Sequence, residues 1–328
     1  MTTTLTRRLV VAVSALALGS GLTLTACGSD DNDSASGNTS ASAEASYPRT
    51  VTVDDGSVEL TAKPEHIAVL SSDLASLVLP LTGGDHVALA PKMSASGDLK
   101  TELDKVGSTM APSASIDAEQ VMASEPDLVM ISARHDFEKD AAEQLRSFDV
   151  PVAVFGGDTW SGSEGIIDHI SEVADLVGEQ DKGMELTDDL SSRRDEIIAR
   201  ADGKDKPKTI GIWAHANQQM IGSKTLMLTG LIREAGGDPA VDHLDAQSMI
   251  TADPEFIVKE APEVIVVQTS ADSGKDAFSE LIDNPAMKDV PAVRDGRVYY
   301  VDSATTGVSS GTAIIDGLDE VSKAIFNE

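Results

Sequence analysis

Short apolar runs alternate with amphipathic stretches from about residue 47 to the C-terminus. The runs are rich in Val and Ile and almost continuously apolar, as is typical of parallel strands that helices cover on both faces. The predicted strands cover residues 66–71, 86–90, 127–132, 151–155, 209–213, 263–268 and 297–301. Strands that alternate with helices predict an α/β fold with right-handed crossovers.

One segment of this pattern occurs twice. Residues 117–131 align with residues 253–267 at a constant offset and without a gap. Each copy begins with an aspartate suited to a helix N-cap, Asp117 or Asp253, and continues through a short helix and a proline–acidic pair into a buried strand. Convergence on a common helix–strand unit is one explanation. Our interpretation is two similar lobes.

A helical segment lies between the two halves. Apolar positions keep helical spacing through much of residues 161–205, and Gly178 and Gly183 are the positions where the helix breaks or bends. We predict one long helical crossing between an N-terminal lobe, residues 47–160, and a C-terminal lobe, residues 206–328.

The N-terminus has the features of a secretory leader. Arg7 and Arg8 precede an apolar run, residues 9–24, which is shorter than a membrane span of about 20 residues. The run ends in Leu-Thr-Ala-Cys, which resembles a bacterial lipobox. We therefore predict a signal peptide over residues 1–26 and lipid attachment (diacylation) at Cys27; an ordinary signal with an accidental cysteine is the alternative.

The composition excludes several classes of site and partner. The single cysteine of the chain lies at the predicted cleavage site, which excludes a disulfide and argues against a cysteine nucleophile or thiolate metal site in the domain. Residues 27–46 lack apolar periodicity and are predicted to be a flexible tether. A net charge of −30 disfavours nucleic acid as a partner.

Five short motifs occur in a fixed order along the chain, at residues 64–73, 126–129, 234–238, 262–267 and 292–299. In order and spacing they resemble class III substrate-binding proteins, which serve ABC importers of iron–siderophores, haem and cobalamin. The similarity covers roughly residues 50–328. The resemblance implies two Rossmann-like α/β lobes joined by a single long helix, with a ligand cleft between them at the carboxyl ends of the strands.

The same resemblance implies a function. We expect an extracytoplasmic lipoprotein, monomeric and anchored to the outer face of the cell membrane, that captures a ferric siderophore. It would deliver this ligand to an ABC permease dimer with its ATPase subunits. Haem or cobalamin is the alternative ligand. The protein is not expected to be an enzyme or to hold a cofactor of its own.

Loops after the predicted strands supply the candidate ligand contacts. The expected ligand-binding residues are Ser72, Lys92, Met93, Arg134, His135, Trp160, Trp213, His215, Met249 and Thr269. Aromatic residues are only 3% of the chain, yet one tryptophan falls in each lobe near a strand end. A tryptophan offers a ligand a large apolar area at low entropy cost. Packing of Trp213 inside the protein at the end of its strand is the alternative, so Trp160 is the preferred contact.

Two basic residues favour an anionic chelate. Arg134 follows a predicted strand and has the fixed donors that bind carboxylates or catecholates, and Lys92 would add positive potential. An arginine paired with Asp136 in a solvated loop is the alternative. No histidine motif typical of a metal site occurs, so no direct metal site is predicted; His135 and His215 would ligate iron only if the ligand were haem.

Two glutamates are candidates for docking on the permease. Glu119 and Glu255 occupy matching positions of the repeated segment, near two helix starts. In the resembling family, one glutamate on each lobe docks on the permease subunits. Stabilisation by the helix dipole is the structural alternative.

One hydrolase-like motif lacks the partner residue that its chemistry needs. Gly307, Ser309 and Gly311 satisfy the Gly-x-Ser-x-Gly pattern, but a nucleophile elbow needs a later histidine, and none follows His243.

Overall fold

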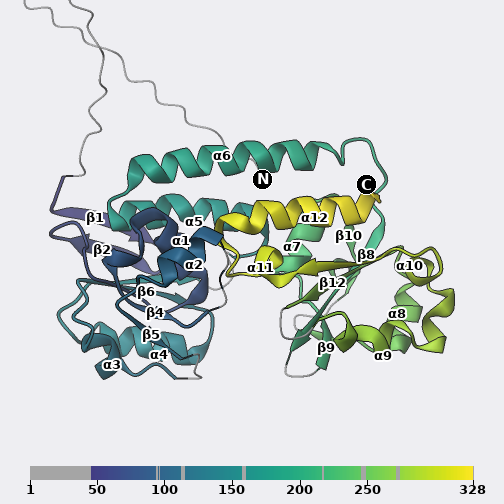
Figure 1. Cartoon of the computed structure of the whole chain (residues 1–328), viewed down its shortest axis with the longest axis horizontal. Coiled ribbons are helices and arrows are strands. Elements are labelled where there is room, and N and C mark those ends of the chain that lie inside the picture. Colours follow the sequence, from purple (N-terminus) through teal and green to yellow (C-terminus); the bar gives the residue numbers. More distant parts are fainter. Residues whose placement is uncertain are drawn as a thin grey trace, which may run out of the picture. The chain divides into compact units, whose positions relative to one another are not determined.

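Two β-sheets organise the computed structural model, which describes residues 46–327 apart from 94, 96, 112–114, 157–159, 216–217, 245–248 and 271–273 (Figure 1). The first sheet is parallel throughout, with the strand order β5-β4-β3-β6-β7. Its strands are β3 (Ile67–Val69), β4 (Val87–Pro91), β5 (Ser108–Met110), β6 (Leu128–Ala133) and β7 (Val152–Gly156). The chain builds outward from β3 in one direction and then continues with β6 on its other side. The carboxyl ends of β3 and β6 therefore form a topological switch point.

The second sheet has the order β11-β9-β8-β12-β13. Its strand order changes direction between β8 and β12, which form the corresponding switch point. Its strands are β8 (Lys208–His215), β9 (Gln218–Ile221), β10 (Asp238–Pro239), β11 (Ile250–Thr251), β12 (Val264–Thr269) and β13 (Val298–Asp302). β12 is parallel to β8 and β13, but β9 is antiparallel to β8. The sequence predicted only parallel pairing here. A hairpin as short as the one between β8 and β9 permits only antiparallel pairing.

The repeated segment has the same structure in both lobes. Asp117 and Asp253 cap the helices α3 (Ala118–Met122) and α8 (Pro254–Glu260) by accepting main-chain N–H groups. Each helix leads into the strand next to the switch point, β6 or β12. The acidic residue after each proline then accepts an N–H from the neighbouring strand segment, Asp127 from His66 and Glu263 from Lys208. The prediction of two similar α/β lobes is confirmed.

Helices and 3-10 turns cover these sheets. They are α1 (Ser72–Thr82), η1 (Gly84–His86), α2 (Gly97–Leu103), α3 (Ala118–Met122), α4 (Asp136–Leu145), α5 (Gly162–Val177), α6 (Gln180–Ala199), α7 (Met227–Glu234), η2 (Ala240–His243), α8 (Pro254–Glu260), η3 (Asp276–Phe278), α9 (Ser279–Ile282), η4 (Pro285–Asp289), α10 (Pro291–Arg294), α11 (Ser303–Thr306), η5 (Gly311–Ala313) and α12 (Ile314–Phe326). A hairpin of β1 (Arg49–Val53) and β2 (Gly56–Leu60), which the sequence did not predict, packs on α5 and β7. No helix in the described part of the chain is long and apolar enough to span a bilayer.

The connection between the lobes contains two helices and not one. Gly178 ends α5 in the left-handed conformation with φ of 73°, the usual geometry of a helix C-cap, and the chain reverses there. α6 then runs back antiparallel to α5, with Gly183 against Ala174 and Arg194 against Ser163. In Figure 1, α6 extends above both lobes, so it alone has the crossing role predicted for the connection.

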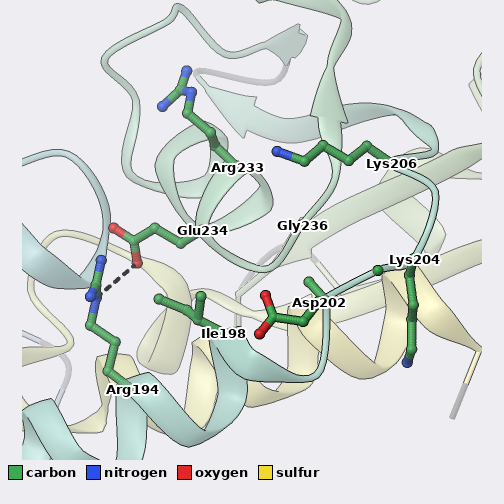
Figure 2. Close-up of a pocket in the computed structure, with 10 residues that line it drawn as sticks. Arg194, Ile198, Asp202, Lys204, Lys206, Arg233, Glu234 and Gly236 are labelled. Atoms are coloured by element: carbon green, nitrogen blue, oxygen red, sulfur yellow. Dashed lines mark ion pairs between the residues drawn. The ribbon is translucent and has the colours of Figure 1, made fainter.

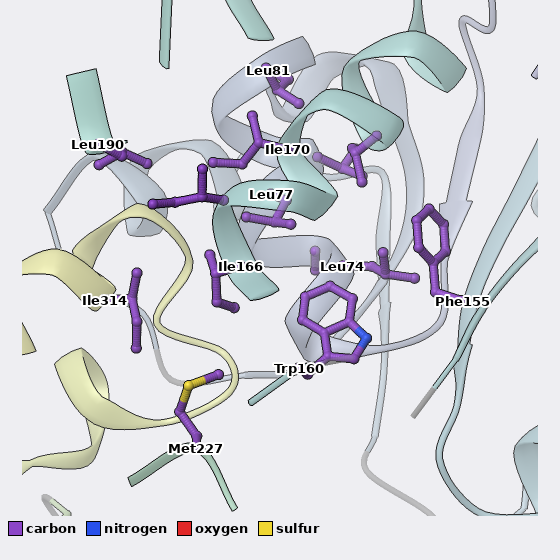
Figure 3. Close-up of a cluster of buried hydrophobic side chains, with 14 of the residues drawn as sticks. Leu74, Leu77, Leu81, Phe155, Trp160, Ile166, Ile170, Leu190, Met227 and Ile314 are labelled. Carbon is purple, nitrogen blue, oxygen red and sulfur yellow. The ribbon is translucent and has the colours of Figure 1, made fainter. Parts of the chain in front are cut away.

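One hydrophobic core joins both lobes. A single buried cluster includes Leu74 of α1, Ile166 of α5, Leu190 of α6, Met227 of α7 and Ile314 of α12 (Figure 3). Two further clusters lie within single lobes, beneath the other face of each sheet. The helical layer is therefore a shared structure and not a flexible linker.

Small residues bring the helices of this layer close together. A Cβ added to Gly230 of α7 would lie 2.5 Å from the main-chain nitrogen of Gly162 at the start of α5. A Cβ on Gly311 would lie 2.6 Å from the carbonyl oxygen of Ser76 in α1. Both contacts join a segment of the second lobe to one before α6, and neither leaves room for a methyl group.

Replacing Gly230 by alanine should destabilise the protein by about 1–3 kcal/mol, because the methyl group forces α7 away from the backbone of α5. Urea unfolding followed by circular dichroism measures the effect. Ser192→Ala, which alters an exposed position of α6, is the control and should leave the unfolding midpoint nearly unchanged. Equal stability of Gly230→Ala and the wild type would contradict the close contact.

Candidate ligand-binding site

The first sheet gathers five of the predicted contacts at one edge. Ser72 begins α1 after β3, Lys92 and Met93 follow β4, and Arg134 and His135 follow β6. All three strands are parallel neighbours, so their carboxyl ends lie together. This edge includes the switch point, where α/β sheets bind ligands.

A buried ion pair closes the switch point itself. Arg134 Nη2 lies 3.0 Å from Oδ2 of Asp73, whose side chain is fully buried, while the Arg134 side chain stays 24% exposed. The Ser132 hydroxyl donates to both carboxylate oxygens of Asp73, at 3.1 and 2.9 Å. The Leu74 main-chain N–H donates to the same carboxylate at 2.8 Å. Arg134 therefore does not pair with Asp136.

This pairing changes the electrostatics expected from the sequence. Burial raises the pKa of the Asp73 carboxyl above its ordinary value, and the nearby charge of Arg134 opposes that rise. With Asp73 ionised, the pair carries no net charge. The positive potential expected at this edge therefore comes from Lys92, which is exposed.

Glu138 fixes the main chain around Arg134. Its buried carboxylate accepts the N–H groups of Arg134 and His135, both at 2.7 Å. The His135 ring lies 3.1 Å from the same carboxylate and stacks on Phe137, and its side chain remains 62% exposed. Main chain and guanidinium are thus held by two different carboxylates.

The second sheet places three of its four predicted contacts near the corresponding edge. Trp213 and His215 lie in the last three residues of strand β8, and Thr269 is the last residue of β12. Trp213 is half-buried, and the Thr269 hydroxyl donates to the carbonyl of Val301. Met249 is 41% exposed just before β11. The side chain of His215 lies outside the described residues, as does the segment 245–248.

Trp160, the preferred aromatic contact, lies elsewhere. Its side chain is only 2% exposed and belongs to the shared core (Figure 3). Its ring stacks on the imidazole of His169 in α5, with 4.2 Å between the ring centroids. The expectation that Trp160 faces a ligand is therefore wrong for this conformation. The sequence could not separate a loop tryptophan at a ligand mouth from one that folds back under α5.

In the described part of the chain, no group of three or more His, Cys, Asp or Glu side chains is placed so that it could hold a metal ion. Asp242 and His243, which the sequence brings close together, have other partners: Arg233 binds Asp242 with two hydrogen bonds, and His243 contacts Asp238.

A surface pocket of about 430 Å³ lies between the end of α6, the following loop and α7 (Figure 2). None of the predicted contacts lines it. Two of its basic residues have acidic partners: Arg194 lies beside Glu234 and Glu164, and Arg233 binds Asp242. Because none of the predicted contacts reaches this pocket, we do not assign the ligand to it.

The two predicted docking glutamates occupy equivalent places. Glu119 and Glu255 are exposed in the first turns of α3 and α8. Each helix returns the chain from the carboxyl edge of its sheet to the amino end of β6 or β12. The first turn of each helix therefore lies toward the carboxyl edge, the side of the switch points.

Two α/β lobes with paired switch points and a shared helical layer define a two-lobed binding protein. A family model described as periplasmic binding protein matches residues 67–305. The match covers most of the chain, and the protein belongs to the periplasmic binding protein family.

Known relatives agree with this assignment. The chain is 26% identical over 286 residues to the petrobactin-binding protein YclQ of Bacillus subtilis (strain 168), covering 83% of this chain and 84% of that protein. The structure of the triscatecholate siderophore-binding protein FeuA from Bacillus subtilis, in complex with ferri-bacillibactin, matches with a TM-score of 0.69 at 17% identity, covering 85% of this chain and 99% of that chain. The periplasmic heme-binding protein RhuT from Roseiflexus sp. RS-1 matches with a TM-score of 0.61 at 20% identity, covering 80% and 99%. At these identities the two structures establish the fold alone.

The surroundings of Trp160 and His169 generate a prediction about pH. The pKa of Glu172 is raised, mainly by burial. The charges of Asp54 and Asp168 raise it further, whereas the charge of His169 lowers it. One carboxylate oxygen of Glu172 is buried without a hydrogen-bond partner among the described residues. Because the folded-state pKa lies above the unfolded one, ionised Glu172 lowers stability as pH rises through the folded-state pKa.

Replacing Glu172 by glutamine removes this ionisation. Thermal melting should show a midpoint about 1–3 °C above the wild type at pH 8, with the difference shrinking as the pH falls below the unfolded pKa of glutamate. Glu185→Gln, at an exposed position of α6, controls for the change in net charge. A shift that is the same at every pH, or equal in the control, would contradict the assignment.

Proposed function

We propose that the protein captures a ferric siderophore outside the cytoplasm and delivers it to an ABC importer. The observation that carries this proposal is the similarity to a petrobactin-binding protein over 83% of the chain. A match of such length between whole chains links the binding role, and not only the fold, to a siderophore.

The edge of the first sheet supports the same ligand class. Arg134 presents a partly exposed guanidinium, and Lys92 adds an exposed ammonium group. Catecholate and carboxylate oxygens of a ferric chelate accept hydrogen bonds from such donors. We place the ligand between the carboxyl edges of the two sheets, with Trp213 and Thr269 as the contacts from the second lobe.

Haem is the second candidate. His135 is exposed at the same edge, and a heme-binding protein shares the fold. An imidazole in this position is a suitable axial ligand for haem iron. A Soret band that forms with haemin and is lost in His135→Ala would favour haem over a siderophore.

The primary test is a titration of the purified protein with ferric tris-catecholate, ferric hydroxamate and haemin, followed by tryptophan fluorescence. We expect saturable quenching by one ferric siderophore class. Lys92→Ala should weaken binding of an anionic chelate about 3- to 10-fold at low salt, and less at high salt, because exposed charges are screened. Lys323→Ala, on α12, is the control for loss of a lysine and should bind like the wild type.

Absence of binding to every ferric siderophore would contradict the proposed function. Wild-type affinity of Lys92→Ala at low salt would contradict only the placement of the ligand.

We further propose that Glu119 and Glu255 dock on the two subunits of the permease. Their support is the equivalence of the two positions, because exposed carboxylates on two similar lobes are complementary to a two-fold partner. The predicted leader adds a lipid anchor at Cys27 to this proposal; Cys27 lies outside the described residues.

Docking and ligand binding can be separated by mutation. Glu119→Ala combined with Glu255→Ala should leave siderophore affinity unchanged and lower siderophore uptake in cells at least tenfold, since only the contact with the permease is lost. Glu143→Ala and Glu280→Ala, at exposed positions of the same lobes, form the control pair. Normal uptake with the double variant would contradict the docking role.

A further inference from the structure

We propose that Asp73 is a positioning residue for the ligand: it orients the Arg134 guanidinium, so that Arg134 recognises the ligand through directed hydrogen bonds rather than net positive charge. This inference rests on the proposed function and concerns the same site. The feature that carries it is the buried carboxylate at the switch point between β3 and β6.

Asp73 holds Arg134 from inside the protein. The carboxylate has no exposure to solvent, whereas the guanidinium that it contacts at 3.0 Å remains 24% exposed. One side of Arg134 is therefore attached to the protein interior, and the other is available at the edge of the sheet. An arginine held in this way loses little rotamer entropy when it binds a ligand.

Asp73 is itself fixed by the two segments that meet at the switch point. Leu74 N–H and the Ser132 hydroxyl donate to its oxygens. The Ser132 main-chain N–H donates in turn to the hydroxyl of Ser71 at 2.7 Å. These contacts join the end of β3 to the end of β6, so the orientation of Arg134 is set by the sheet and not by a loop.

Stability alone does not explain this arrangement. Taking a carboxylate out of water is costly, and a buried ion pair is often no more stable than apolar residues of similar size. The Arg134 Nε–H is buried and has no hydrogen-bond partner in the described structure, which adds a further cost. A pair retained at such cost, at the edge where the ligand is placed, is best explained by the orientation that it gives to Arg134.

The pair also sets what Arg134 contributes to recognition. With Asp73 ionised, the pair carries no net charge, so Arg134 adds hydrogen bonds of fixed direction, whereas Lys92 adds net attraction to an anion. A ligand with coplanar oxygen acceptors, such as a catecholate or carboxylate group on the chelate, suits a guanidinium held in one plane.

Replacing Asp73 by asparagine distinguishes two possible roles of this carboxylate, positioning Arg134 and reducing its positive charge. The substitution keeps the shape and most of the hydrogen bonds but removes a negative charge beside an anionic ligand. If Asp73 positions Arg134, affinity for the ferric siderophore falls about 3- to 10-fold. If Asp73 only reduces the positive charge of Arg134, affinity rises. Equal or higher affinity of Asp73→Asn overturns the inference.

Two further variants protect the test against a folding defect. Ser132→Ala removes hydrogen bonds to Asp73 without changing any charge and should also weaken binding, by a smaller factor. In an Arg134→Ala background, the effect of Asp73→Asn should vanish, because a positioning residue acts only through the residue that it positions. An effect that persists without Arg134 identifies a merely structural role and overturns the inference. Thermal melting of each variant confirms that folded protein is compared.

Failure of the inference and failure of the proposed function give different results. A wild-type protein that binds no ferric siderophore refutes both. A wild-type protein that binds a ferric siderophore, while Asp73→Asn binds it as tightly, refutes the positioning role alone.

Discussion

The shared hydrophobic core of the helical layer is the constraint on which the rest of the structure depends. Side chains of α1, α5, α6, α7 and α12 form one buried cluster, so neither lobe has a complete core without the other. The glycine contacts at Gly230 and Gly311 allow these helices to approach at backbone distance. Ion pairs between α6 and α12, Arg193 with Asp316 and Arg200 with Asp319, add to the connection at the surface. Large rotation of one lobe against the other would break this packing, and interiors this dense resist gradual deformation.

A fixed helical layer gives the two sheets fixed edges. Ligand recognition then depends on side chains whose orientation is set before the ligand arrives. The first lobe has such a side chain in Arg134, which two carboxylates hold from different sides, Asp73 through the guanidinium and Glu138 through the main chain. Preorganised groups of this kind bind with smaller entropic cost than flexible ones.

Sequence patterns predicted the architecture because they reflect local physics. Buried parallel strands are apolar runs, and the caps at Asp117 and Asp253 marked the repeated unit; both were confirmed. The chain reversal at Gly178 was harder to predict, because a glycine that bends a helix and one that ends it leave the same pattern. Trp160 and Arg134 show which features of the site could not be predicted from the sequence. Neither the stacking of Trp160 on His169 nor the pairing of Arg134 with Asp73 follows from spacing along the chain, since each depends on contacts between distant segments.

Hydrogen–deuterium exchange with and without a ferric siderophore can locate the ligand, which we place between the carboxyl edges of the two sheets. A ligand bound there should slow exchange around residues 71–74, 92–93 and 133–135 of the first lobe and at the ends of β8 and β12 in the second. The pocket beside α6, around Asp202 and Arg233, should be unaffected. Protection confined to that pocket, with exchange at both sheet edges unchanged, would show that the ligand does not bind between the two sheets.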